Sequence, residues 1–133
     1  MVAAIRSDAG ASRRLLLSAL EQRFVLLVSV PLMLEYEAVM TRAQHLLASN
    51  LTVDDVGILL DAVASVGEPV RSAFLWRPSL RDADDDMVLE VAVNGRADAI
   101  VTFNRRDFRP AEEQFGIEVL SPGAAIKRLG GGL

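Results

Sequence analysis

The sequence predicts an α/β domain in which helices cover both faces of a central parallel sheet. Residues 24–30 and 98–103 are short, mostly apolar runs with several β-branched residues, as expected of strands that are buried on both faces. Segments with apolar residues at helical spacing lie between them, and strands that alternate with helices are typical of parallel sheets. Because 133 residues suit one such domain, we expect a single α/β domain over residues 1–133.

The other elements follow from local signals. Residues 1–5 are apolar and predict a strand at the start of the chain, and Ser12 can cap a helix over residues 12–23. Pro31 suits the first turn of the next helix, where a missing N–H costs no hydrogen bond. The remaining expected elements are the helix from Pro31 to residue 47, a helix over 51–67, a short strand or loop over 69–80, a helix over 87–95, a strand over 117–120 and a terminal helix over 121–129.

Composition and charge exclude several classes of protein. Half of the residues are apolar and the mean hydropathy is positive, which excludes a disordered chain. No apolar run reaches the ~18 residues that span a bilayer, so we expect no membrane segment. The chain has no cysteine, so it has neither disulfides nor thiolate metal ligands, and we expect a cytoplasmic location. A net charge of −4 does not indicate a general binder of polyanions.

The stretch RDADDDMVLE, residues 81–90, places four aspartates in five positions before an apolar helix. One interpretation is helix capping, since acidic residues stabilise a helix N-terminus by about 0.3–1 kcal/mol each. Four carboxylates in this space also repel one another, which favours a bound cation. On this stretch alone the metal site is the stronger interpretation, and capping remains the alternative.

Further polar residues follow the predicted strands. Glu35 comes after strand 24–30, whereas Glu37 falls on another face of the same helix. Asn104 and Asp107 come directly after strand 98–103. Because sites in open α/β sheets form at the carboxyl ends of the strands, we expect these carboxylates and the aspartate run to converge at one edge. Taken singly, Glu35 suits a solvated helix position and Asp107 a turn.

The available ligands restrict the type of metal. The only histidine, His45, falls late in the predicted helix 31–47, where it suits a surface position, so a zinc site of the usual kind is not expected. Carboxylates without nitrogen or sulfur ligands favour a hard cation, Mg²⁺ or Mn²⁺. Such a cation offsets phosphate charge and lowers the pKa of bound water, as phosphodiester hydrolysis requires.

Three segments together resemble the PIN-domain nucleases, in particular toxin components of bacterial toxin–antitoxin systems related to VapC. They are LLVSVPLMLEYEAVM, LRDADDDMVLEVAVNGRADAIVTFNRRDF and GIEVLSPGAAIKRL, in the order and spacing of that family, and they cover essentially the whole chain. The resemblance implies a three-layer α/β/α PIN-like fold with a central parallel sheet, divalent-metal-dependent ribonuclease activity, a cognate antitoxin protein as partner and a homodimer.

The resemblance also assigns residues by position. Glu35 matches the glutamate of the second segment, and Asp85 matches the aspartate that begins the following helix. Asp82 matches a further aspartate typical of this branch. These residues and Asp107 are the implied metal ligands, and Glu35, Asp85 and Asp107 the implied catalytic residues. Thr102 and Asn104 match a segment that positions ligands or water, while Arg105, Arg106 and Arg109 could supply a local basic patch for RNA or simply form a solvated loop.

One segment of the family pattern is not matched. Members usually begin with a strand that ends in Asp-Thr-Asn, whose aspartate is a principal metal ligand. The match here begins just after that triplet, which makes residues 1–5 a shortened first strand, and Asp8 falls in the next loop. Either the chain starts at an internal methionine or the ligand is absent. Two functions therefore stay open: a metal-dependent ribonuclease, and a catalytically inactive PIN module that acts through oligomerisation or antitoxin binding.

Overall fold

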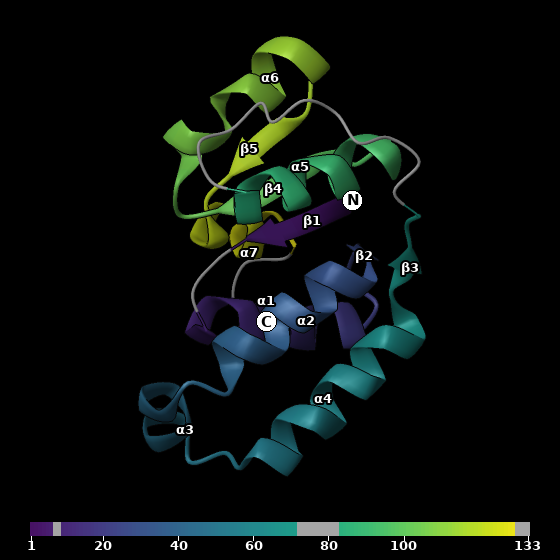
Figure 1. The fold of residues 1–133 in the computed structure, drawn as a ribbon. Coiled ribbons are helices and arrows are strands. Elements are labelled where there is room, and N and C mark those ends of the chain that lie inside the picture. Colours follow the sequence, from purple (N-terminus) through teal and green to yellow (C-terminus); the bar gives the residue numbers. More distant parts are fainter. Residues whose placement is uncertain (7–8, 72–82, 130–133) are drawn as a thin grey trace.

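The computed structural model describes residues 1–6, 9–71 and 83–129 and has the predicted α/β architecture (Figure 1). Its sheet has five strands, all parallel, in the order β3-β2-β1-β4-β5. The strands are β1 (Val2–Arg6), β2 (Val25–Val28), β3 (Glu68–Pro69), β4 (Ala99–Thr102) and β5 (Glu118–Leu120). The helices are α1 (Ala9–Leu20), α2 (Val30–Met40), α3 (Ala43–Ser49), α4 (Val53–Val66), α5 (Ala83–Asn94), α6 (Arg109–Phe115), α7 (Pro122–Arg128) and the short 3₁₀ helix η1 (Arg105–Phe108).

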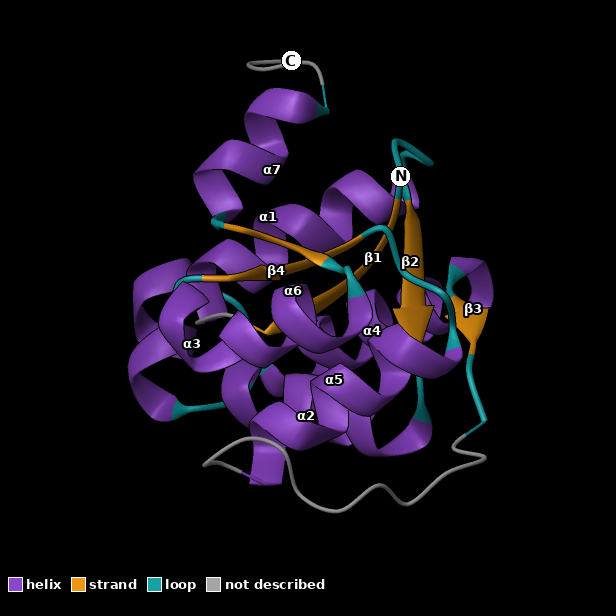
Figure 2. Ribbon diagram, turned by 90° about the horizontal axis from the view of Figure 1, so that it is seen from above, coloured by secondary structure: helices purple, strands orange, loops and turns teal. Residues whose placement is uncertain are grey.

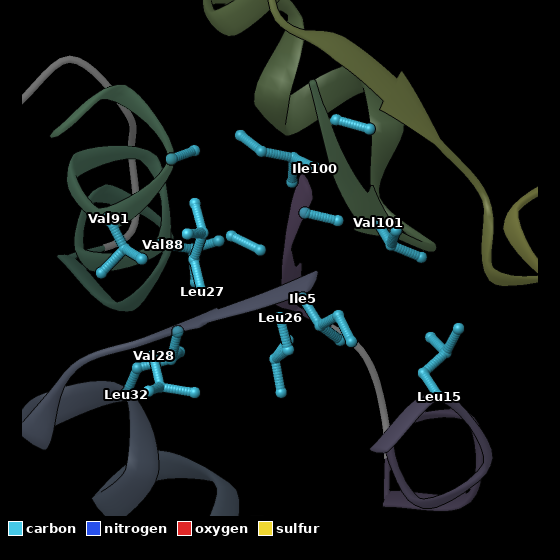
Figure 3. Close-up of a cluster of buried hydrophobic side chains, with 14 of the residues drawn as sticks. Ile5, Leu15, Leu26, Leu27, Val28, Leu32, Val88, Val91, Ile100 and Val101 are labelled. Carbon is cyan, nitrogen blue, oxygen red and sulfur yellow. The ribbon is translucent and has the colours of Figure 1, made fainter. Parts of the chain in front are cut away.

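Helices cover the sheet on both faces. The helix α5 packs on β1, β2 and β4, whereas α1 packs on β2 and α7 on β4. Seen from above, α7 lies on one side of the sheet and α5 on the other (Figure 2). Neighbouring residues of a strand therefore bury opposite faces: Leu26 and Leu27 are both almost fully buried, and in Figure 3 Leu27 lies toward Val88 of α5 while Leu26 lies on the opposite side of β2. In the part of the chain that the structure describes, no helix is long and apolar enough to cross a membrane.

The first strand, β1, lies at the centre of the sheet. With five residues β1 is the longest of the five strands described, and it pairs with β2 on one side and β4 on the other. Ala3, Ala4 and Ile5 are completely buried. β1 is therefore the central strand of the sheet, paired on both sides and covered on both faces.

The predicted helix 31–47 is two helices. Helix α2 ends at Thr41, whose hydroxyl and N–H both donate to the carbonyl of Glu37, and α3 starts again at Ala43. His45 thus lies near the beginning of α3 and not late in a long helix, and its Nε2 is buried without a hydrogen-bond partner among the described residues. The prediction that His45 lies late in a long helix was therefore wrong.

Two short helices after β4 were not predicted. The 3₁₀ helix η1 and helix α6 fill the connection to β5, and α6 ends at Gly116, which has a positive φ of 65°. Phe108, at the end of η1, is fully buried. Its ring anchors the connection, and the polar residues around it are consequently held at the carboxyl edge of the sheet.

Candidate functional site

A positively charged side chain lies at the carboxyl end of β1. The last residue of the strand is Arg6, whose Nε donates to Asp85 Oδ1 at 3.1 Å and whose Nη1 donates to Glu35 Oε1 at 3.3 Å. The side chains of Arg6 and Glu35 are 23% and 20% exposed, and that of Asp85 is 7% exposed. One guanidinium therefore bridges two carboxylates that come from different helices, in a partly buried setting.

Glu35 reaches this point because of how α2 begins and packs. Ser29, the last residue before the helix, accepts a hydrogen bond from Leu32 N at 3.2 Å and so caps the N-terminus. One residue beyond Glu35, the buried Tyr36 donates its hydroxyl hydrogen to the carbonyl of Ile5 at 2.9 Å. That bond ties α2 to the end of β1, directly beside Arg6. Glu37 is exposed on another face of the helix, as predicted.

The Tyr36 phenol is held in its neutral form. Burial raises the pKa of Tyr36 well above its ordinary value, and the nearby positive charge of Arg6 offsets only part of that increase. A phenol that stays protonated keeps its donor hydrogen for Ile5 at all ordinary pH values. Tyr36 thus positions the end of β1 and is not placed to act as an acid or a base.

Asp85 reaches the same edge of the sheet from a different helix, α5. It belongs to α5, the helix that packs on β1, β2 and β4, and it is one of the few buried charged residues described. Val88, Leu89 and Ala92 of the same helix are buried in the core. Since residues three and four apart lie on one helix face, burial of these apolar residues turns Asp85 inward as well.

The end of β4 lies beside the end of β1. Thr102 is the register partner of Arg6 in the parallel pairing, and it is fully buried. Its hydroxyl accepts a hydrogen bond from the backbone N–H of Asn104 at 3.0 Å, which shapes the turn into η1. The carbonyl of Asn104 in turn accepts from the N–H of Asp107. The side chains of Asn104, Arg105 and Asp107 are exposed.

The structure brings together only part of the predicted ligand set. Glu35 and Asp85 meet at Arg6, whereas no group of three or more histidine, cysteine or acidic residues in the described ranges is arranged to hold a metal ion. Asp107 therefore does not join such a group. Asp82 and Asp8 lie outside the described residues. The carboxylate oxygens of Glu35 and Asp85 are of the ligand type that Mg²⁺ and Mn²⁺ prefer. In this structure one oxygen of each accepts a hydrogen bond from the guanidinium of Arg6.

Arg6 is the residue of this site that sequence reasoning missed. Its position at the end of a buried strand is the position at which α/β sheets place functional side chains, and that was the available signal. A charged residue following AAI also suits a plain strand end, so nothing in the sequence indicated two carboxylate partners 29 and 79 residues away.

Comparison with known proteins identifies one family. A family profile described as PIN domain matches residues 1–106, which is most of the chain. Neither a comparison with curated proteins nor one with solved structures gave a significant match. The matched range contains β1, Glu35, Asp85, β4 and the start of η1, whereas Asp107 lies one residue beyond it.

Proposed function

This chain belongs to the PIN-domain family, and from that membership we propose that it is a divalent-metal-dependent ribonuclease. PIN domains have a nuclease-type function, generally bind divalent metals and generally act on RNA. The observation that carries the proposal is the pair of carboxylates at one guanidinium: Glu35 and Asp85 come from separate helices and meet at the carboxyl end of the central strand. Opposed carboxylates at this edge of a parallel sheet suit a site for a hard cation.

In the proposed site Glu35 and Asp85 hold Mg²⁺ or Mn²⁺, with Asp82 and Asp107 as further carboxylates of the proposed ligand set. The cation supplies positive charge for the phosphate and lowers the pKa of a water ligand. The buried position of Asp85 supports its role as the fixed ligand, because a packed helix holds a carboxylate in one place better than a loop does. Thr102 and Asn104 shape the turn at the neighbouring strand end and orient the edge that faces the substrate.

The proposed RNA contacts come from the turn after β4. Arg105, Arg106 and Arg109 are all exposed within five residues of one another, on the connection that Phe108 anchors. Positive charge concentrated here compensates for a negative net charge, since phosphate contacts act locally. Arginine is also well suited to phosphate, because its fork of N–H donors makes paired hydrogen bonds.

A second candidate function is a PIN module without catalytic activity, which acts through oligomerisation or antitoxin binding. The observation that favours it is Arg6, because a guanidinium in contact with both Glu35 and Asp85 already neutralises part of their charge. The described residues also lack a group of three metal-binding side chains. Under this candidate the acidic pair is a structural feature of the edge of the sheet.

We further propose that the protein is the toxin component of a toxin–antitoxin pair. Support comes from the surface between α2 and α4, where Val30, Leu34 and Ile58 are 75%, 61% and 70% exposed. A hollow of about 540 Å³ lies beside it, and its lining includes Val30 and Leu34, the acidic residues Glu37 and Asp61, and one basic residue, Arg71. An apolar surface whose edge carries two acidic residues and one basic residue has an acidic excess, which suits a basic amphipathic segment as the chemistry of the antitoxin.

We also propose a homodimer, because exposed apolar side chains lie on α3 and at the start of α4. Leu47 of α3 is 85% exposed and Val53 at the start of α4 is 59% exposed, which is apolar surface that pairing could cover. Light scattering at micromolar concentration measures the mass of the particle. Twice the mass of one 14.4 kDa chain supports the dimer, whereas the mass of a single chain contradicts it.

The test of the leading function is cleavage of a structured RNA by the purified chain with Mg²⁺ or Mn²⁺. The controls are EDTA and the variant Asp85→Asn, which removes the charge of one proposed ligand at nearly constant size. Cleavage that requires the cation and is lost in Asp85→Asn supports the ribonuclease. Absence of cleavage together with binding of a basic partner segment supports the inactive module.

A further inference from the structure

The same oxygen atoms serve Arg6 and the proposed cation. Arg6 contacts Asp85 Oδ1 and Glu35 Oε1, and these two carboxylates belong to the ligand set proposed for the cation. The charges of the three side chains sum to −1, whereas the two carboxylates alone carry −2. A divalent ion placed between the carboxylates would lie against a positive guanidinium, so the two cations exclude each other from this position.

We infer that Arg6 sets the metal affinity of the site by competing with the divalent cation for Glu35 and Asp85. The inference rests on the proposed cofactor position. In the state described here the guanidinium occupies that position and the site is closed. Metal binding then requires an open state in which the Arg6 side chain has left, and the apparent affinity is reduced by the fraction of molecules that are open.

The burial of Asp85 and the length of the Arg6 side chain make Arg6 the member that can leave the bridge. Asp85 is 7% exposed and belongs to a helix packed on three strands, so it has little freedom to move. Arg6 and Glu35 are exposed to nearly the same extent, 23% and 20%, but the longer stem of Arg6 can carry the guanidinium into water while the strand stays in place. The backbone around it is fixed separately, by strand pairing to Thr102 and by the bond from Tyr36 to the carbonyl of Ile5.

The opposite interpretation is that the bridge is only a structural ion pair. In that case the two carboxylates bind no divalent cation, whether or not the Arg6 guanidinium is present. Removing Arg6 would then leave two uncompensated negative charges and create no metal affinity. The two interpretations therefore differ in a binding measurement, independent of whether the protein cleaves RNA.

The test is a titration of the full chain with Mn²⁺, in which the free ion is measured by electron paramagnetic resonance. We compare the wild type with Arg6→Met, which keeps an unbranched stem and removes the charge, and with Arg128→Met as the matched control. Arg128 is also in an ion pair, with Glu118, but on an exposed surface. We expect the Kd for Mn²⁺ to fall at least about tenfold in Arg6→Met, as when a site that is open in ~10% of molecules becomes fully open, and to stay unchanged in Arg128→Met. An unchanged or higher Kd in Arg6→Met overturns the inference.

A second measurement uses the wild type alone, in case Arg6→Met does not fold. The Nε–Hε resonance of Arg6, assigned through its side-chain carbons, reports directly on the bond to Asp85. We expect this hydrogen to be protected from exchange without metal and to lose its protection as Mg²⁺ is added. Binding of a cation with the resonance unchanged means that Arg6 stays in place, and the inference is then wrong.

Failure of the inference and failure of the proposed function give different results. Tighter Mn²⁺ binding by Arg6→Met without RNA cleavage by any form supports the competition and removes the ribonuclease. Metal-dependent cleavage by the wild type with equal Mn²⁺ affinity in both proteins supports the ribonuclease and removes the competition.

Discussion

Two arginine–carboxylate clusters in this molecule have the same chemistry and different surroundings. Arg6 bridges Glu35 and Asp85 at the end of the central strand, with side chains 23%, 20% and 7% exposed. Arg128 of α7 contacts both carboxylate oxygens of Glu118 on β5, and these side chains are 49% and 48% exposed. The first cluster joins three elements, while the second joins a strand to the helix that follows it.

From this difference we expect that contact geometry alone does not decide how much an ion pair contributes to stability. The Glu118 pair has the better fork-to-fork contact, but water screens it, and exposed pairs contribute little to stability. The Arg6 bridge has one bond to each carboxylate, yet its partners are partly removed from water, so losing one of them leaves a poorly solvated charge. We therefore expect the Arg6 bridge to contribute more to the free energy of unfolding than the Arg128–Glu118 pair, although its contact geometry is less favourable.

The largest expected effect is that of Asp85→Asn. The variant removes the charge that is most buried in the cluster and weakens the bond from Arg6 Nε, so we expect a loss of about 2 kcal/mol in the free energy of unfolding, in the range of hydrogen bonds to charged groups. Denaturation by urea in EDTA measures it. A loss below about 0.5 kcal/mol would place this cluster with ordinary surface pairs.

A smaller effect is expected for Tyr36→Phe. The variant keeps the ring and removes the bond to the Ile5 carbonyl, which leaves a buried acceptor without its partner. We expect a loss of about 1 kcal/mol, measured in the same way. The end of β1 should also become less well fixed, and the exchange of the Arg6 Nε–Hε hydrogen should become faster. If stability falls and this exchange rate does not change, Tyr36 supports the core without positioning Arg6.

Tyr36 also gives a pH dependence with a definite sign. Burial raises the pKa of its phenol, so the stability that depends on the neutral phenol is present below the unfolded value near 10 and is lost as the pH rises above it. Tyr36 is the only tyrosine in the chain, so its ionisation can be followed by ultraviolet absorbance without overlap. We expect no phenolate in the folded protein at pH 10 and its appearance on unfolding. Half-ionisation near pH 10 in the folded state would mean that the phenol is open to water.

The smallest effect is expected at the exposed pair. The Arg128 guanidinium lowers the pKa of Glu118, but both side chains are about half exposed. We expect Glu118→Gln to leave the melting temperature unchanged within error at physiological salt. A clear decrease in the melting temperature would show that exposure is a poor guide to the two clusters.

The sequence predicted the fold better than the site, for physical reasons. Continuous apolar runs such as residues 24–30 reflect burial on both faces, which is a property of the strand itself. The break between α2 and α3 has no glycine or proline to mark it, since it falls at Thr41 and Arg42. Helix α6 has seven residues, too few for a helical period to show, although Pro110 in its first turn was a usable signal.

The site depends on contacts between distant residues. From the residues alone, Glu35 and the aspartate run were candidates because they follow a strand or begin a helix, and helical spacing indicated that at most one of Glu35 and Glu37 faces the site. The contact of Glu35 and Asp85 with Arg6 could not be predicted. Arg6 is a single charged residue whose contacts are fixed by the register of β1 with β4 and by the packing of α2 and α5. Periodicity along a chain does not determine such a three-way meeting.

The most direct test of the central claim, that Arg6 is bound between Glu35 and Asp85, is a double-mutant cycle in EDTA. It uses the unfolding free energies of the wild type, Arg6→Met, Asp85→Asn and the double variant. If the two side chains interact as described, the effects are not additive, and we expect a coupling of at least about 1 kcal/mol, within the range for residues in contact. Effects that add to within about 0.5 kcal/mol, as for independent sites, would contradict the bridge and the competition inferred from it.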